Sequence, residues 1–484
     1  MVNFYSPKKN KSSDASKSQL IGRRVIVTIS HLDHLAQGVS ADHDPLIFIE
    51  GVLPGETVEV EITEDRGKVC NARLLNILQP SEFRQLPFCE HVDVCGGCQT
   101  QHCQTDAMLQ FKQAAIQNLI LHTALDTNQS APPAKRVLSK ATRGGKNKKM
   151  RKFSDKQSNL DWQAALHSSP TGYRRKTRLS VDARNADALK LGFRTKGSNK
   201  IFSLQQCPVL NQQLEQLIEP LQQMFAKLQT PSNIGHVSLL NADNGVQVCI
   251  RTIHSLSHQD CALCAEFAEK YGLQLILEDK QNRQEFVTQP DKQLAYEINP
   301  KLSLQIHNDD FVQVNPQVNQ NMIKQAMDWL ELDKSDAVLD LFCGIGNFSL
   351  PIAAQCDRLV GVEGVPKMVQ RAQHNATINK LNNCHFIHSD LNSTKLSEHE
   401  QIKTCNKVLL DPAREGALAV VKQLATLKPS HILYVSCNPA TFARDAAQLI
   451  EKNYRLDKLC VMDMFPQTAH TELMALFVPL NKRK

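Results

Sequence analysis

A cysteine in the C-terminal third of the chain is the first candidate for covalent chemistry. Residues 434–441 read Tyr-Val-Ser-Cys-Asn-Pro-Ala-Thr, and the β-rich run from His431 to Val435 predicts a buried strand in front of Cys437. The Asn-Pro pair that follows breaks strand pairing and turns the backbone. A thiol at a strand end, near a helix start, is placed to ionise and act as a nucleophile. The alternative is a small buried hydrophobic side chain, the usual purpose of an intracellular cysteine.

Acidic residues follow the other predicted strands of this region. Residues 337–348 read as a hydrophobic strand and a glycine turn that opens a helix, and the next strand ends at Glu363. A carboxylate about twenty residues after such a turn can take a ribose diol. The turn reads Gly-x-Gly-x-Phe and lacks the third glycine of dinucleotide sites, so a nucleoside sulfonium fits better than a pyrophosphate.

Three further carboxylates fall at expected strand boundaries, namely Asp390, Asp411 and Glu472. Asp390 follows the third strand, where it could hold an adenine amine. Asp411 ends the fourth strand, and Glu472 opens the last one. Since active sites of open α/β sheets lie at the carboxyl ends of the strands, we expect these groups to share one edge with Cys437.

A second cysteine set suggests a metal centre. Cys89, Cys95 and Cys98 form a Cys-x5-Cys-x2-Cys pattern with two glycines, which fits a metal or iron–sulfur centre better than chance packing. A fourth thiolate is needed. Cys103 is expected at the start of a helix over 106–121, whereas Cys207 lies in a turn-like Gln-Cys-Pro context, so Cys207 is favoured. Zinc remains the alternative metal, because spacing does not settle metal identity.

The remaining segments must position these residues. Five short β segments between residues 20 and 78 predict a small closed barrel of the kind that grips RNA, or else a module that only supports its neighbours. Alternating basic residues at 173–179 suit RNA phosphates, although an amphipathic strand with a solvated basic face is the alternative. Residues 123–162 are polar and basic, which predicts a disordered insertion that holds phosphates or is simply solvated.

Composition and patterning predict a multidomain α/β protein. Of the 484 residues 42% are hydrophobic and 22% charged, the net charge is +7, and no apolar run has membrane-spanning length. The N-terminal segment lacks the apolar core of a signal peptide, so we expect a cytoplasmic protein with no membrane partner. The expected segments are a disordered lead at 1–18, the barrel at 19–79, a central α+β domain at 80–300 and the catalytic α/β domain at 301–484. Within the central domain, helices are expected at about 211–228 and 258–271.

Taken together, these motifs resemble the RNA uracil-C5-methyltransferase family, most closely its 23S ribosomal RNA branch. The motifs are the cysteine set with Cys207, Asp-Leu-Phe-Cys-Gly-x-Gly-Asn-Phe, Leu-Leu-Asp-Pro-Ala-Arg and Ser-Cys-Asn-Pro-Ala-Thr. The resemblance runs from about residue 20 to 477, without the basic insertion. It implies an OB-like TRAM barrel, a central domain with a [4Fe-4S] cluster, and a Rossmann-like domain that uses S-adenosylmethionine.

The resemblance also implies a role for each matching residue. Cys437 matches the nucleophile and Glu472 the base. The matches to cluster ligands are Cys89, Cys95, Cys98 and Cys207, and the matches to cofactor and substrate contacts are Gln313, Phe342, Asn347, Glu363, Asp390 and Asp411. Asp411 and Gln313 could instead contact the uracil. The sequence departs from the family in its long basic insertion and at Gln467, where a histidine is expected.

The chemistry itself requires these residue types. Carbon 5 of uracil is too weak a nucleophile, so a thiolate must first add to carbon 6, and a carboxylate must later remove the carbon 5 proton. The target uridine must leave its stack, which is least costly in a single-stranded loop or bulge of the 23S rRNA. We expect the enzyme to act as a monomer.

Three other functions would account for parts of the sequence pattern. A noncatalytic RNA-binding protein that assists ribosome assembly would explain the barrel and the basic charge. A tRNA 5-methyluridine methyltransferase would share the catalytic motifs but lack the barrel and the cluster. A radical methylase is disfavoured, because no Cys-x3-Cys-x2-Cys motif is present.

Overall fold

The computed structural model describes residues 20–125, 160–185, 188–288, 292–393 and 395–480. The expected lead and nearly all of the basic insertion therefore lie outside the described residues. Contacts within the chain divide it into two compact units, residues 1–85 and 86–484. Within the described ranges, no helix is long and apolar enough to cross a membrane.

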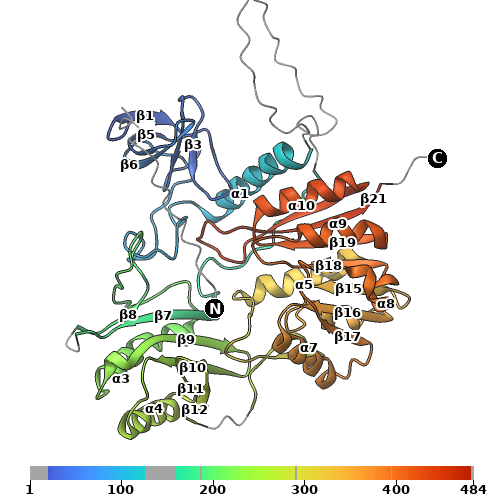
Figure 1. Cartoon of the computed structure of the whole chain (residues 1–484). Coiled ribbons are helices and arrows are strands. Elements are labelled where there is room, and N and C mark those ends of the chain that lie inside the picture. Colours follow the sequence, from blue (N-terminus) through green and yellow to red (C-terminus); the bar gives the residue numbers. More distant parts are fainter. Residues whose placement is uncertain (1–19, 126–159, 186–187, 289–291, 394, 481–484) are drawn as a thin grey trace, which may run out of the picture. The chain divides into compact units, whose positions relative to one another are not determined.

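The N-terminal unit is a six-stranded sheet around a core of its own (Figure 1). Its strands are β1 Arg24–Thr28, β2 His31–Leu32, β3 Gly38–Ser40, β4 Leu46–Ile49, β5 Thr57–Asp65 and β6 Val69–Gln79, in the order β1-β5-β6-β4-β3-β2. Alternate residues of β5, Val58, Val60 and Ile62, point into the core, as the period of two in a half-buried strand requires. The five predicted β segments are confirmed, and β2 was not predicted.

The second unit contains a mixed six-stranded sheet in its central part. Its strands are β7 Lys176–Asp182, β8 Lys190–Gly192, β9 Ile234–Ala242, β10 Gly245–Thr252, β11 Leu273–Glu278 and β12 Gln284–Phe286, in the order β12-β11-β10-β9-β7-β8. Helix α4 (His258–Tyr271) begins at the Ser257 cap and ends at Gly272, and it lies where the sequence predicts it.

One prediction for this region is wrong, because a helix expected to be continuous is two separate helices. The expected helix from Asn211 to Leu228 is two pieces, α2 (Gln212–Glu215) and α3 (Ile218–Ala226). Pro220 is the third residue of α3. Proline has no N–H for a helical hydrogen bond and is tolerated only in a first turn, so the chain starts a new helix just before it.

The C-terminal part is a seven-stranded sheet with the order β17-β16-β15-β18-β19-β21-β20. Its strands are β15 Ala337–Leu341, β16 Arg358–Glu363, β17 Cys384–His388, β18 Lys407–Leu410, β19 His431–Ser436, β20 Tyr454–Met462 and β21 Glu472–Pro479. The first five run parallel, and β21 is antiparallel to both β19 and β20. The start of β21 therefore lies at the edge where β15, β16, β18 and β19 end.

Helices cover both faces of this sheet (Figure 1). One core holds α5 (Pro316–Leu330), α6 (Ser349–Ala353) and α7 (Pro366–Ile378), and the other holds α8 (Glu400–Lys403), α9 (Leu418–Leu427) and α10 (Pro439–Glu451). The short hairpin of β13 (Ala295–Asn299) and β14 (Leu302–Gln305) contacts α7. This is the doubly wound arrangement in which ligands bind beyond the carboxyl ends of the strands.

Two segments from before residue 300 also pack on the C-terminal sheet. Helix α1 (Thr105–Ile120) places Leu109, Ile116 and Ile120 in the core that it shares with α10. Residues 160–166 run along β20, with bridges from Trp162 to Leu459 and from Leu166 to Met462. The boundary expected near residue 300 stays a prediction.

Candidate active site

The predicted nucleophile lies in a tightly bonded turn between β19 and α10. Ser436 ends β19, and its hydroxyl accepts from the Asn438 N–H at 3.2 Å. Asn438 caps α10, since its side chain accepts from the Ala440 N–H at 3.1 Å, and Pro439 occupies the first helical turn. Cys437 stands between Ser436 and Asn438 and is half-buried. The Ser-Cys-Asn-Pro sequence therefore fixes the thiol at the strand end by local hydrogen bonds.

Two carboxyl groups face this thiol across the edge of the sheet. Burial, together with the charges of Glu472 and Asp411, raises the pKa of Cys437 to about 11. Burial also raises the pKa of Asp411 to about 7, and burial with the charges of Asp411 and Asp463 raises that of Glu472 to about 8. Mutual repulsion in a poorly solvated site has this effect on acidic groups. Titrating groups with shifted pKa values that gather at strand ends are typical of a catalytic site.

Arg414 is the positive group of this cluster, and the sequence reasoning missed it as a site residue. Its charge lowers the pKa of both Cys437 and Glu472, against the effect of burial. Its carbonyl accepts from Asn438 Nδ2 at 2.9 Å and from Thr441 Oγ1 at 3.1 Å. The start of α10 thus holds the nucleophile and this arginine together. The Asp-Pro-Ala-Arg run directly after β18 was the signal for it.

The glycine turn after β15 is built from left-handed backbone. Phe342, Gly344 and Gly346 have φ values of 63°, 56° and 101°. The carboxylate of Glu363, at the end of the neighbouring strand, accepts from the Gly344 N–H at 3.1 Å and from the Val365 N–H at 3.0 Å. The turn and the acidic strand end therefore form one unit.

Two polar residues, Asp340 and Asn347, form hydrogen bonds that hold this turn in place. Asp340 is buried and accepts from Ser349 Oγ at 2.5 Å, and burial raises its pKa to about 7. Asn347 accepts from Tyr296 Oη at 3.0 Å and exchanges two hydrogen bonds with Asn319. Asn347 thus ties the turn to β13 and α5. Asp340 was not predicted as a site residue, although it is the first residue of the Asp-Leu-Phe-Cys-Gly motif.

We expect Gly346→Ala to weaken binding of an adenosine-containing cofactor by about tenfold or more, because a left-handed alanine costs about 1–2 kcal/mol. A β-carbon at this position would also lie 2.8 Å from Leu350 Cδ1. Calorimetry with S-adenosylhomocysteine measures the effect. Gly235→Ala, in a strand with only ordinary contacts around the added carbon, is the matched control. Equal affinity in the two variants would contradict a cofactor role for the turn.

Asp390 and Gln313 are two further predicted contact residues. Asp390 follows β17 by two residues and accepts from the Asn392 N–H and from Ser393 Oγ, each at 3.0 Å. Gln313 is half-buried three residues before α5. Their roles in binding stay predictions.

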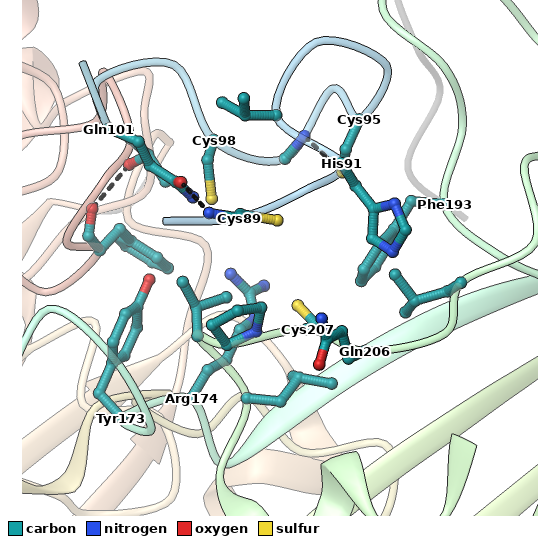
Figure 2. A pocket seen from close by; sticks show the side chains of 18 of the residues that line it. Cys89, His91, Cys95, Cys98, Gln101, Tyr173, Arg174, Phe193, Gln206 and Cys207 are labelled. Atoms are coloured by element: carbon teal, nitrogen blue, oxygen red, sulfur yellow. Dashed lines mark hydrogen bonds between the residues drawn. The ribbon is translucent and has the colours of Figure 1, made fainter. Parts of the chain in front are cut away.

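The four cysteines matched to cluster ligands line one cavity of about 340 Å³. Figure 2 shows Cys89, Cys95 and Cys98 on one loop and Cys207 on the opposite wall, with Arg174 reaching in between. His91 lines the same cavity and was not foreseen from the sequence. Cys103 is buried elsewhere, with its sulfur 3.4 Å from the Gln104 carbonyl oxygen. In the described part of the chain, no three His, Cys, Asp or Glu side chains are gathered closely enough to hold a metal ion.

The same cavity reaches the catalytic edge. Arg414 and His470 both line it, and Glu472 lies two residues after His470. Gln467, where the family pattern has a histidine, is buried and left-handed with φ 70°. Its backbone oxygen accepts from the N–H groups of Gln99 and Thr100 at 2.9 and 3.1 Å. The residues just after Cys98 thus touch the loop that leads to Glu472.

Comparison with known proteins gives the family. The sequence model described as tRNA (Uracil-5-)-methyltransferase matches residues 140–479, and the TRAM domain matches 18–75. Relatives named 23S rRNA (uracil(1939)-C(5))-methyltransferase RlmD are 38% identical in Photobacterium profundum and 37% in Vibrio vulnificus. The alignments cover 99% of this chain and 97% and 100% of those relatives. This chain belongs to the RNA uracil-C5-methyltransferase family.

A solved member of the family has the same fold. The Pyrococcus abyssi tRNA (uracil-54, C5)-methyltransferase, crystallised with S-adenosyl-L-homocysteine, aligns with a TM-score of 0.69 over 96% of this chain and 100% of its own. At 22% sequence identity the likeness concerns the fold alone. The resemblance read from the motifs is thus confirmed at the level of family, TRAM domain and methyltransferase fold.

The described part of this chain also has an open groove of about 390 Å³ beside the central sheet, lined by four basic and three acidic side chains. Arg178 of β7 and Arg251 of β10 line it, and Phe311 in the segment before α5 is 67% exposed at its wall. Arg174 lines both this groove and the thiol cavity. Positive charge beside an exposed aromatic ring suits a single-stranded nucleic acid.

Proposed function

We propose that this protein methylates carbon 5 of a uridine in 23S rRNA, with S-adenosylmethionine as the methyl donor. The observation that carries the proposal is the gathering of Cys437, Glu472, Asp411 and Arg414 at one sheet edge. Curated relatives that carry the 23S rRNA name align over nearly the whole chain, and residues 18–75 of this chain match the TRAM domain.

The residues of the edge account for the bonds that form and break on the uracil ring. The Cys437 thiolate adds to carbon 6 of the uracil, and the electron pair of the C5=C6 bond moves onto carbon 5 and the carbonyl. The positive charge of Arg414 favours that thiolate. After carbon 5 has gained its methyl group, Glu472 removes the remaining proton, the double bond re-forms and the thiolate leaves. Asp411 lies beside both groups and is suited to bind the uracil edge.

The glycine turn and the acidic strand ends are suited to hold the cofactor. S-adenosylmethionine supplies a methyl group from its sulfonium when it is bound. The backbone of Phe342 and Gly344 leaves room for close approach, and we assign the ribose hydroxyls to Glu363 and the adenine to Asp390. Asn347 supports the turn through Asn319 and Tyr296. Gln313 is kept as a contact of either cofactor or uracil.

We further propose that Cys89, Cys95, Cys98 and Cys207 hold a [4Fe-4S] cluster. The support is that these thiols line one cavity and that thiolate sulfur is the ligand such clusters take. Four protein thiolates leave no open iron, so the role of the cluster would be structural. Zinc is the alternative occupant.

We expect Cys207→Ser and Cys95→Ser to lose most of the iron and the brown chromophore of the anaerobically purified protein. Cys103→Ser should keep both, because that thiol does not line the cavity. Iron and sulfide analysis with visible absorption measures this. If the Cys103 variant is colourless and the Cys207 variant is brown, the fourth ligand is Cys103 and not Cys207. Stoichiometric zinc in the wild-type protein, without sulfide, would replace the cluster.

The RNA is expected to bind as a single-stranded loop or bulge with the target uridine flipped out of its stack. The support is the TRAM domain and the four basic side chains of the groove beside the thiol cavity. A groove of this kind holds phosphates, while the flipped base enters the site where Cys437 stands. We also propose that the enzyme acts as a monomer in the cytoplasm, which size-exclusion chromatography and fractionation can check.

We expect Arg178→Ala to weaken binding of a 23S rRNA fragment and to lower the salt dependence of binding by about one ion. Arg178 is exposed in the groove, so its loss should not disturb the core. Arg184→Ala is the control, since Arg184 is 89% exposed and paired with Asp182 outside the groove. Fluorescence anisotropy at several salt concentrations measures the affinity of each variant for the RNA fragment. Parallel losses in the two variants would mean that the groove is not the track of the RNA.

The function is tested by incubating the anaerobically purified protein with S-adenosylmethionine and unmodified 23S, 16S or transfer RNA. Mass spectrometry then maps any 5-methyluridine. One methylated uridine in 23S rRNA supports the proposal. Methylation of tRNA alone would identify a tRNA enzyme. Tight rRNA binding with no methylation and no cofactor affinity would favour a noncatalytic assembly factor.

A further inference from the structure

A buried ion pair connects α1 to the strand that precedes the proposed base. Lys112 Nζ lies 3.0 Å from Asp463 Oδ1, and the two side chains are 3% and 4% exposed. The residues are 351 positions apart in the sequence. Lysine and aspartate are almost never fully buried unless they are paired. Removing one partner leaves the other charge buried and unpaired, which is destabilising.

The same ammonium holds the other end of the loop that leads to Glu472. Asp463 directly follows β20, whose last residue, Met462, pairs with Glu472 in the ladder of β20 and β21. Lys112 Nζ also donates to the carbonyl oxygen of His470 at 3.2 Å. Lys112 therefore contacts both ends of the segment 463–470, and Glu472 lies two residues after that segment.

Other contacts brace the middle of this loop. Gln467 accepts from two backbone N–H groups of residues 99 and 100, and the Ala469 N–H donates to Gln99 Oε1 at 3.2 Å. Tyr173 Oη donates to the Pro466 carbonyl oxygen at 3.0 Å. The loop is thus fixed through its backbone, while Lys112 contributes the only charge among these bracing contacts.

The charge matters because Glu472 sits among acidic neighbours. Asp411 and Asp463 both raise its pKa, Cys437 lies beside it, and Arg414 acts in the opposite direction. Lys112 places a positive charge against Asp463 without contacting Glu472 itself. Without that charge, the carboxylate of Asp463 would act on the base uncompensated.

We propose that Lys112 is a positioning residue for the proton-removal step, acting through Asp463 and the carbonyl of His470. In this step the Glu472 carboxylate takes the carbon 5 proton. The C–H electron pair forms the C5=C6 bond, and the electrons of the C6–S bond return to Cys437 as a thiolate. Lys112 keeps the base in place and ionised for this event. The inference rests on the proposed function, because it needs the covalent RNA adduct.

Lys112→Met removes the charge and leaves a side chain of similar length. We expect turnover to fall about tenfold and its pH dependence to move to higher pH by up to about one unit. A methylated covalent enzyme–RNA adduct should accumulate in denaturing gels, because the steps before proton removal remain. Lys324→Met, which removes an exposed lysine paired with Asp328 on α5, should behave as wild type.

Asp463→Asn tests the electrostatic effect of the ion pair on Glu472 by removing its negative partner. The amide can still accept from Lys112 but carries no negative charge, so the pH dependence should move to lower pH. In the double variant Lys112→Met with Asp463→Asn, the pH dependence should return towards wild type. If Lys112→Met does not fold, as judged by its melting curve, the direction of the Asp463→Asn shift decides.

Several results would overturn the inference. One is a Lys112→Met enzyme in which turnover and adduct formation fall together, as a general structural defect would cause. A second is that the pH dependence of turnover is the same as wild type in both single variants. A third is that the pH dependence of Asp463→Asn moves to higher pH. If wild-type enzyme methylates no RNA, the proposed function fails instead, so the two failures are distinguishable.

Discussion

Cys437→Ala should abolish formation of 5-methyluridine, lowering the rate by about ten-thousand-fold or more, as removal of a covalent nucleophile does in other enzymes. The thiol is the only group of the catalytic cluster that can add to carbon 6, since Glu472 and Asp411 are carboxyl groups and Arg414 is a cation. The variant should also form no covalent adduct with RNA. Mass spectrometry of the RNA and denaturing gels of the mixture measure the two effects.

The same variant should keep its fold and its cofactor affinity. Cys437 is half-buried at a turn whose hydrogen bonds come from Ser436 and Asn438, so loss of the sulfur removes little packing. Cys261→Ala, at a half-buried thiol on α4, is the matched control and should retain activity. Substantial methyl transfer by the Cys437 variant would disprove the covalent mechanism.

Glu472→Gln should lower turnover by about a thousandfold, within the range of a lost general base. The amide cannot take the carbon 5 proton, so the methylated adduct should persist with Cys437 still attached to carbon 6. Gel bands that survive denaturation and contain the transferred methyl group would report this state. Glu451→Gln, at the end of α10, should release its product normally.

The pH dependence of the wild-type enzyme should reflect the same carboxyl group. Burial and the charges of Asp411 and Asp463 raise the pKa of Glu472 to about 8. Below that pH the group is mostly protonated and cannot accept a proton, so adduct release should slow as the pH falls from 8 to 6. Single-turnover release measured across this range checks the sign. Release that is faster at pH 6 than at pH 8 would exclude Glu472 as the base.

The sequence alone determined the fold of the catalytic part and the residue types at its edge. Strand ends were readable because parallel buried strands are short hydrophobic runs, and a polar residue or a glycine turn directly after one must lie at the carboxyl edge. Glu363, Asp411 and Cys437 were placed in this way. Glu472 opens its strand, so it shares this edge only because β21 runs antiparallel, which the structure shows.

Only the tertiary structure decided which distant residues support those at the edge. The pairing of Lys112 with Asp463 and the ties of Asn347 to Asn319 and Tyr296 join segments far apart in the chain. The packing of α1 on the catalytic sheet also joins two segments that are far apart in the chain. Local periodicity reports which face of an element is buried, but the partner that buries a given charge is set by how whole elements pack.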